Sequence, residues 1–305
     1  MTVPVSEAAP IIRSPSSAAQ RLRNLWLCAD DYGISPAVNR GIRELIARGR
    51  VNATSVMVTA PSFSAAEAAA LAALAGSGRG AAIGLHFTLT APFRPSTPAY
   101  RPVGPDDAFP SLPRMLAAGL LGRLDSGALR AEVASQFGAF TAAFGRPPDF
   151  VDGHQHVHLL PQVGDALLDL MAAAPAAWIR QCGRASRLSA RWGDPKGLLL
   201  DVLSRRLRAR SAARGVPINP AFAGTYNFAR ERNYDALFAS FLDGLPDGGL
   251  VMCHPGFVDA ELQRLDSLIA MREQEYSFFA GERFPQLLAS KGFVLATVAP
   301  LRGPE

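Results

Sequence analysis

The sequence predicts a single α/β domain built around a mostly parallel β-sheet. Short apolar runs alternate along the chain with longer stretches of helical character, an order that is typical of βα units. Each of the five histidines also lies at or just past the end of one of these apolar runs. In parallel α/β folds the carboxyl ends of the strands collect on one rim, so this placement predicts an active site there.

The first βα unit is predicted from an apolar run, two acidic residues and a helix start. A strand is expected at 25–29, directly before Asp30 and Asp31. Ser35 supplies an N-cap, the proline after it suits the first helical position, and Gly49 can end the helix. The order strand, acidic loop, helix therefore opens the domain.

Further strands follow at intervals that leave room for helices. One is expected at 53–59, and Ser64 with Glu67 three residues later matches a capping box ahead of an alanine-rich helix. The remaining strands are expected at 82–88, 150–156, 178–181, 250–254 and 293–298. About seven strands result.

Two stretches lack a clear period. Between Ala91 and Gly122 prolines and glycines are frequent, which predicts a long excursion on the functional rim. Residues 215–227 are also irregular. No internal repeat or hinge separates two cores, so we expect one domain at 22–305 after a flexible leader at 1–21.

Composition excludes several classes of protein. With 305 residues, 49% of them hydrophobic and 19% charged, the chain can bury a large core, and wholesale disorder is excluded. No apolar run reaches the roughly 18 to 20 residues of a membrane-spanning helix. The first twenty residues lack the apolar region of a signal peptide, which predicts a cytoplasmic protein. Three widely spaced cysteines predict reduced, buried thiols.

The net charge of +5 comes almost entirely from arginine. The densest basic run, at 205–214, falls where a helix is expected and is interpreted as a solvated helix face. An arginine-rich module that binds nucleic acid or an anionic membrane is an alternative, but it leaves the histidines unexplained. We therefore expect no nucleic-acid partner. The oligomeric state stays open, with a homodimer among the options.

The segment Asp152-Gly-His154-Gln-His156-Val-His158 is the strongest chemical signal. In a strand, these four titratable side chains would share one face. Burying them without partners would cost several kcal/mol, whereas imidazole and carboxylate together suit Zn²⁺, Mn²⁺, Fe²⁺, Co²⁺ or Ni²⁺ well and Mg²⁺ less well. One strand cannot bring all three histidines to one ion, because alternate residues lie roughly 6.5 to 7 Å apart. One histidine is therefore expected to bind, and the others to support it or contact substrate.

Three further positions fit such a site. The adjacent carboxylates Asp30 and Asp31 either face water, cap the next helix or hold a cation. His86 lies within an otherwise apolar strand. His254 precedes a proline and a glycine at a strand end, where it is either a turn residue or a proton-transfer group near neutral pH.

These motifs, in this order, resemble the YdjC/ChbG-like carbohydrate deacetylases, a family that includes chitooligosaccharide deacetylases and a hopanoid-biosynthesis branch. The resemblance covers about Leu25 to Val298. It is carried by Ala-Asp30-Asp31-Tyr-Gly-Ile-Ser-Pro, Gly-Leu-His86, the 152–158 segment, and His254-Pro-Gly with Asp266 and Arg272-Glu273 downstream.

The resemblance implies a distorted (β/α) barrel related to polysaccharide deacetylases, and removal of N-acetyl groups from amino sugars with one divalent metal ion, Mg²⁺ by family. It implies that Asp31, His86 and His154 are the metal ligands, Asp30 the general base and His254 the acid. Amide hydrolysis needs these parts: an activated water, oxyanion stabilisation and a proton for the leaving amine.

Substrate contacts are expected around this centre. Arg180 can orient Asp30 or touch substrate, and His156 and His158 are further candidates for substrate contact. Phe222 and Tyr226 can stack on a sugar ring, or pack under a loop. A metal-dependent phosphoesterase or cyclic amidohydrolase is the enzymatic alternative, although two-metal phosphoesterases use more carboxylates than this sequence offers.

Overall fold

The computed structural model describes residues 21–76, 80–98, 100–101, 103–173, 177–184, 195–226, 233–267 and 269–297. The predicted leader lies outside these residues except for Arg21. In this part of the chain, none of the helices combines the length and apolar character that crossing a membrane requires.

Eight strands in the described residues form one parallel sheet with the order β5-β4-β3-β2-β1-β7-β6, while β8 pairs with the start of β1. The sheet curls so that its two edges meet: Ile179 bridges Ile218, and the Phe222 N–H donates to the Gly183 carbonyl. The strands are β1 (Arg23–Tyr32), β2 (Ala53–Val56), β3 (Ala82–Phe87), β4 (Phe150–Gly153), β5 (Trp178–Ile179), β6 (Phe222–Ala223), β7 (Gly249–Cys253) and β8 (Phe293–Leu295). The predicted (β/α) barrel is thus confirmed, and the two-residue edge strands account for its distortion.

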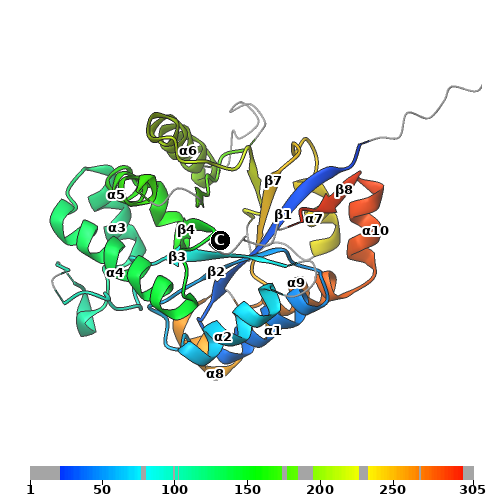
Figure 1. The fold of residues 1–305 in the computed structure, drawn as a ribbon, viewed down its shortest axis with the longest axis horizontal. Helices are drawn as coiled ribbons and strands as arrows, with labels where there is room; N and C mark the ends of the chain where they lie inside the picture. The colour runs from blue at the N-terminus through cyan, green and yellow to red at the C-terminus, as the bar shows by residue number, and fades with distance from the viewer. Residues whose placement is uncertain are drawn as a thin grey trace, which may run out of the picture.

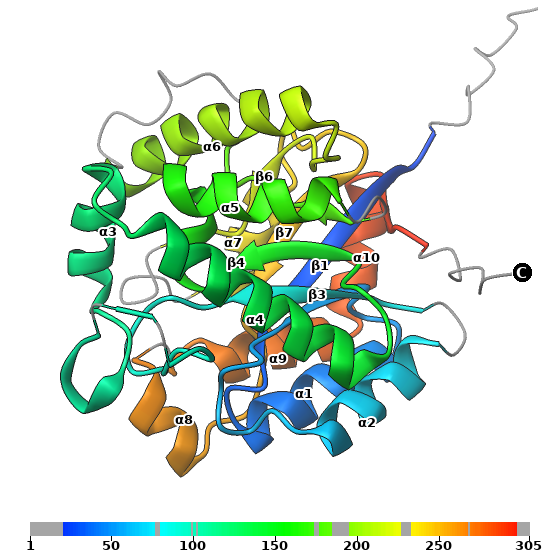
Figure 2. The ribbon, with the colours of Figure 1, turned by 60° about the vertical axis from the view of Figure 1, so that its left-hand side comes forward.

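Helices surround the sheet, as Figure 1 shows, and α4, α5 and α6 lie side by side outside β4 in Figure 2. They are α1 (Pro36–Ala47), α2 (Ala65–Ala75), α3 (Leu112–Leu120), α4 (Ser126–Phe144), α5 (Pro161–Ala172), α6 (Pro195–Arg214), α7 (Tyr234–Phe241), α8 (Ala260–Leu265), α9 (Arg272–Ala280) and α10 (Arg283–Ser290), with 3₁₀ turns η1 (Pro105–Asp107) and η2 (His154–Leu159). The predicted caps form: Ser35 accepts from the Val38 N–H, and Ser64 from the Glu67 N–H.

The core follows from the near-continuous apolar strands that a sheet covered by helices requires. Leu25, Leu27, Ile83, Val151 and Val251 are fully buried. The prediction for the basic run at 205–214 is confirmed in part, because it lies on α6, where Arg210 pairs with Asp165 and Arg214 with Asp169.

Several predicted boundaries are wrong. The strand predicted at 150–156 ends at Gly153, and the chain turns into η2 with Gln155 and His156 in the left-handed region. The stretches predicted as irregular contain ordered elements, namely α3 inside 91–122 and β6 inside 215–227. Strand β6 is missed because two residues cannot establish a period.

Candidate metal centre

The titratable side chains come together at the carboxyl edge of the sheet. Asp31 lies near the end of β1 and His86 near the end of β3, while His154, Arg180 and His254 come just after β4, β5 and β7. Because all paired strands are parallel, these ends share one rim. The predicted location of the site is therefore supported by the topology.

A β-bulge lets both adjacent aspartates serve this site. Successive residues of a regular strand point to opposite faces. The register between β1 and β2 shifts between Ala29 and Tyr32, and Asp31 has a φ of 68°. This local kink re-aims the side chains, as bulges beside active sites do. Asp30 and Asp31 are both buried and contact different partners.

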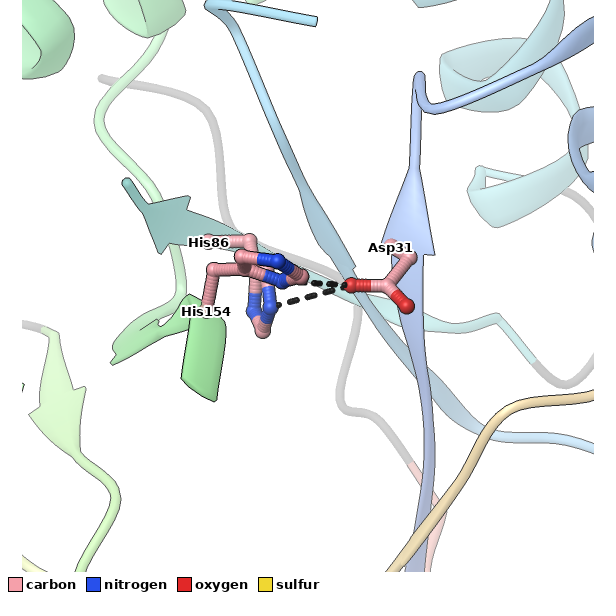
Figure 3. Close-up of side chains that lie close together, drawn as sticks. All are labelled: Asp31, His86 and His154. Carbon is pink, nitrogen blue, oxygen red and sulfur yellow. Dashed lines mark hydrogen bonds and ion pairs between the residues drawn. The ribbon is translucent and has the colours of Figure 1, made fainter. Parts of the chain in front are cut away.

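Asp31, His86 and His154 form one compact buried cluster, which Figure 3 shows with both imidazole rings directed at the carboxylate. Asp31 Oδ1 lies 3.3 Å from His86 Nε2 and 3.1 Å from His154 Nδ1. One ligand atom from each residue lies within 4.8 Å of the others. A carboxylate and two imidazoles converging in this way fit a divalent ion with positions left for water and substrate.

The partners of His86 and Asp31 suit this role. His86 Nδ1 lies 2.6 Å from Asp152 Oδ1 and 2.9 Å from Ser55 Oγ. An ionised carboxylate only accepts hydrogen bonds, so with an ion bound between His86 and Asp31 the proton of His86 would lie on Nδ1, toward Asp152, and Nε2 would offer its lone pair to the ion. The Arg272 guanidinium donates to Asp31 Oδ2 over 2.6 Å. Burial raises the pKa of Asp31, but Arg272 and the two histidines outweigh it and hold that pKa well below its ordinary value.

Asp30 is held apart from this cluster. Arg180 Nη2 donates to Asp30 Oδ1 over 2.9 Å, and the same guanidinium forms an ion pair with Asp152. Burial raises the pKa of Asp30, but Arg180, His86 and His254 together outweigh it, and the pKa lies below its ordinary value. Arg180 is itself buried and contacts Asp30, as the interpretation that it orients Asp30 requires.

A second cluster of possible ligands joins Cys28, Asp30 and Asp152. The Arg180 guanidinium contacts both of these carboxylates and compensates their charge. In the described part of the chain, the Asp31 cluster differs from this one in bringing two imidazole rings to its carboxylate, which is the donor set that suits a divalent transition-metal ion.

The histidines of η2 diverge instead of sharing a face. His154 points to Asp31, His156 lies 3.5 Å from Cys182 Sγ, and His158 Nε2 lies 2.9 Å from the Arg180 carbonyl. The expectation of a shared strand face is wrong, because the strand ends at Gly153. His158 is fully buried, which argues against the predicted substrate contact, while His156 is half-buried.

The two aromatic candidates for sugar stacking are also engaged with protein. Phe222 is 1% exposed on β6, its ring 6.0 Å from that of His156, so stacking on a sugar is not open to it. The Tyr226 hydroxyl donates to Glu275 Oε1 over 2.5 Å. Of the two predicted roles, packing under a loop describes Phe222.

His254 sits half-buried at the rim, where its backbone N–H donates to Glu275 Oε2 over 2.5 Å. Desolvation by the surrounding protein lowers the pKa of His254 to about 4, against the charges of Asp31 and Asp30, which raise it. Burial raises the pKa of Glu275 to about 7.

The excursion after β3 covers one side of the cluster. The Phe93 ring meets that of His154 edge-on, with 5.5 Å between the centroids. Glu132 of α4 anchors this segment by accepting the Ser96 and Thr97 N–H groups, each over 2.9 Å. The predicted position of the excursion on the functional rim is thus supported by its contact with His154.

Sequence reasoning gave no role to several of these residues. Asp152 was part of the alternating motif, but its bond to His86 crosses from β4 to β3 and has no local signal. Arg272 was named only within the family resemblance, and Ser55, Glu132 and Glu275 had no signal. Each acts through a partner far away in the sequence.

Together these features define a class: a curled parallel (β/α) barrel with an Asp/His/His cluster at its strand ends and a separately held carboxylate beside it. The family model described as YdjC-like protein matches residues 24–290, and the chain belongs to this family.

Relatives and one solved structure agree with this. The chain is 30% identical over 287 residues to a chitooligosaccharide deacetylase of Serratia marcescens, covering 90% of this chain and 97% of the relative. It is 27% identical over 285 residues to one of Yersinia pestis, covering 88% and 95%. A crystal structure of a candidate cellobiose-phosphate cleavage protein of Enterococcus faecalis superposes with a TM-score of 0.66 at 22% identity, over 90% of this chain and 97% of that chain. The last comparison concerns the fold alone.

Proposed function

We propose that the protein is a metal-dependent hydrolase that removes N-acetyl groups from an amino sugar, free or within an oligosaccharide or glycoconjugate. The observation that carries the proposal is the buried Asp31/His86/His154 cluster beside Asp30, which a guanidinium holds outside that cluster. Relatives named chitooligosaccharide deacetylases, similar over nearly their whole length, support the N-acetylated sugar as substrate.

Asp31, His86 and His154 would hold the ion, which supplies Lewis-acid activation of water and of the acetyl oxygen. Two imidazoles favour Zn²⁺, Mn²⁺, Co²⁺ or Ni²⁺, while the family resemblance favours Mg²⁺. Asp152 keeps His86 in the tautomer that presents Nε2.

Asp30 acts as the general base. Its lowered pKa keeps it ionised, and Arg180 holds its carboxylate in place to take a proton from water. His254 donates a proton to the departing amine. The proton that Asp30 takes from the attacking water replaces the one that His254 gives to the amine, so the two transfers balance over one turnover.

Acetate release from a panel of N-acetylated mono- and oligosaccharides, with and without prior removal of metal by a chelator, tests the proposal. We expect release from at least one amino sugar, its loss after chelation and its return with one of Zn²⁺, Mn²⁺, Co²⁺, Ni²⁺ or Mg²⁺. Phosphate release from phosphoesters without acetate release from any sugar would favour the phosphoesterase alternative instead.

A further inference from the structure

Glu275 is a buried acidic side chain to which the proposed chemistry gives no task. It lies on the first turn of α9 and is fully buried. Its Oε2 accepts the backbone N–H of His254 and its Oε1 accepts the Tyr226 hydroxyl, each over 2.5 Å. A buried carboxylate costs free energy unless such bonds compensate it, so this arrangement has to be specific.

The first turn of α9 touches both halves of the site. The Arg272 side chain donates to Asp31, while its backbone carbonyl accepts the N–H of Gly256, two residues after His254. Glu275, three residues along the same turn, holds His254 itself. One rigid element therefore sets the distance between the cluster and the loop that bears His254.

On its opposite side, the loop that contains His254 and Gly256 packs closely against α1. A Cβ on Gly256 would lie 3.1 Å from Val38 Cα, and a Cβ on Gly41 would lie 2.9 Å from Gly256 Cα, so the loop is pressed against α1. With α1 fixing one side, the contact with Glu275 determines where the backbone of His254 sits.

We propose that Glu275 is a positioning residue: it fixes the backbone at His254 and so aims this imidazole at the leaving nitrogen of the substrate. The inference rests on the proposed function, in which His254 is the proton donor. Glu275 also holds the Tyr226 hydroxyl, so the tests below isolate the part of its effect that passes through His254. Misplacement of a catalytic group by a fraction of an ångström is enough to slow proton transfer strongly.

The first test needs no activity. In the intact protein, nuclear magnetic resonance of the His254 amide reports a charged acceptor as a strongly downfield proton. In Glu275→Gln we expect this resonance to move upfield and the His254 ring resonances to shift, while bound Zn²⁺ stays at one equivalent. Unchanged His254 resonances would overturn the inference, whether or not the protein proves to be a deacetylase.

The second test compares leaving groups. With N,N′-diacetylchitobiose as amide probe and 4-nitrophenyl acetate as ester probe, Glu275→Gln should lower kcat for the amide about 10- to 100-fold at nearly constant KM. The ester, whose leaving group needs little proton assistance, should lose less than about 3-fold. Equal losses on both probes would show a general structural role and would overturn the inference.

The third test is a double-mutant cycle. If Glu275 acts through His254, adding Glu275→Gln to His254→Ala should cause no further loss beyond about 2-fold. If the double variant lost activity by the product of the two single losses, Glu275 would not act through His254. Glu282→Gln is the matched control, because it makes the same chemical change at an exposed residue that only pairs with Arg50 at the surface. If the wild-type protein were inactive on these probes and on the whole sugar panel, the proposed function would fail, and the resonance test would still decide about Glu275.

Discussion

At the scale of single residues, the proposed function assigns the binding of the cation and the transfer of protons to different carboxylates. Asp31 contacts two histidines and Arg272, whereas its neighbour Asp30 contacts Arg180, although the two share one peptide bond. The bulge at Asp31 makes this division possible. Two adjacent carboxylates therefore have different partners, as the proposed function requires.

This division predicts opposite results for two variants. Asp30→Asn should keep the metal and lose kcat by a factor on the order of 10² to 10⁴, the usual contribution of general acid–base catalysis. His154→Ala should lose metal because one of the three ligands is gone. Metal analysis of the folded proteins, together with acetate release, measures both. Loss of metal from Asp30→Asn would place Asp30 among the ligands, and a full equivalent at unchanged affinity in His154→Ala would remove that histidine from them.

Asp152 offers a finer test of the same geometry. Asp152→Asn can also donate a hydrogen bond to His86 Nδ1, which would put the proton on the nitrogen that has to face the ion. We expect metal affinity to fall about 10- to 100-fold, the usual effect of removing such a supporting carboxylate. Competition with a chromogenic chelator measures this affinity. Unchanged affinity would show that the bond to Asp152 does not fix the ring.

At the scale of secondary-structure elements, η2 is the place where the structure differs from the strand that the residue pattern predicts. The alternation of Asp152, His154, His156 and His158 has the period of a strand, yet the strand ends at Gly153. The turn is fixed by contacts that the pattern does not contain, above all His158 folding back over Gly153 and bonding the Arg180 carbonyl. The strand starts and helix caps, which depend on neighbouring residues, could be predicted from sequence.

The turn predicts a cost for Gly153→Ala. The added Cβ would lie 2.9 Å from His158 Nδ1 and 3.0 Å from its backbone nitrogen, so either the turn or the ring has to move. We expect destabilisation of about 1 to 3 kcal/mol in the free energy of unfolding, measured by denaturant titration. Gly138→Ala on α4 is the control, because nothing lies within 4 Å of its Cβ, and it should stabilise by about 0.5 to 1 kcal/mol. If Gly153→Ala left the free energy of unfolding unchanged, η2 would be able to rearrange around the added Cβ at little cost.

At the scale of the whole molecule, the sequence predicts the parallel sheet from its apolar runs and the functional rim from its histidines, whereas the barrel is implied by the family resemblance. It did not predict the partners of those residues. Arg272 reaches Asp31 across 241 positions, and Glu275 reaches His254 from another element. Such pairs depend on how the sheet curls, which no window of residues encodes.

Buried histidine also predicts how stability changes with pH. Burial lowers the pKa of His158 to about 4, against 6.5 ordinarily. Between pH 4 and pH 6.5 the unfolded chain binds more protons at His158 than the folded chain does. The free energy of unfolding should therefore rise as the pH increases from 4 to 6.5, and this gain is lost when the pH is lowered through that range. One such group accounts for about 3 kcal/mol at most. In metal-free protein, denaturant titrations at both ends of this range should show a smaller difference for His158→Gln than for the wild type, and parallel curves would contradict the assignment.

The span between Asp31 and Arg272 has a consequence for folding itself. Ligands and their supports come from β1, β3, η2 and α9, so the cluster assembles only once the chain has closed over nearly its whole length. An ion bound there favours the closed chain over every shorter or partly open form, with a free energy that grows with the logarithm of its concentration. The cell's supply of the metal would then set how much of this protein is folded, as well as how much of it is active.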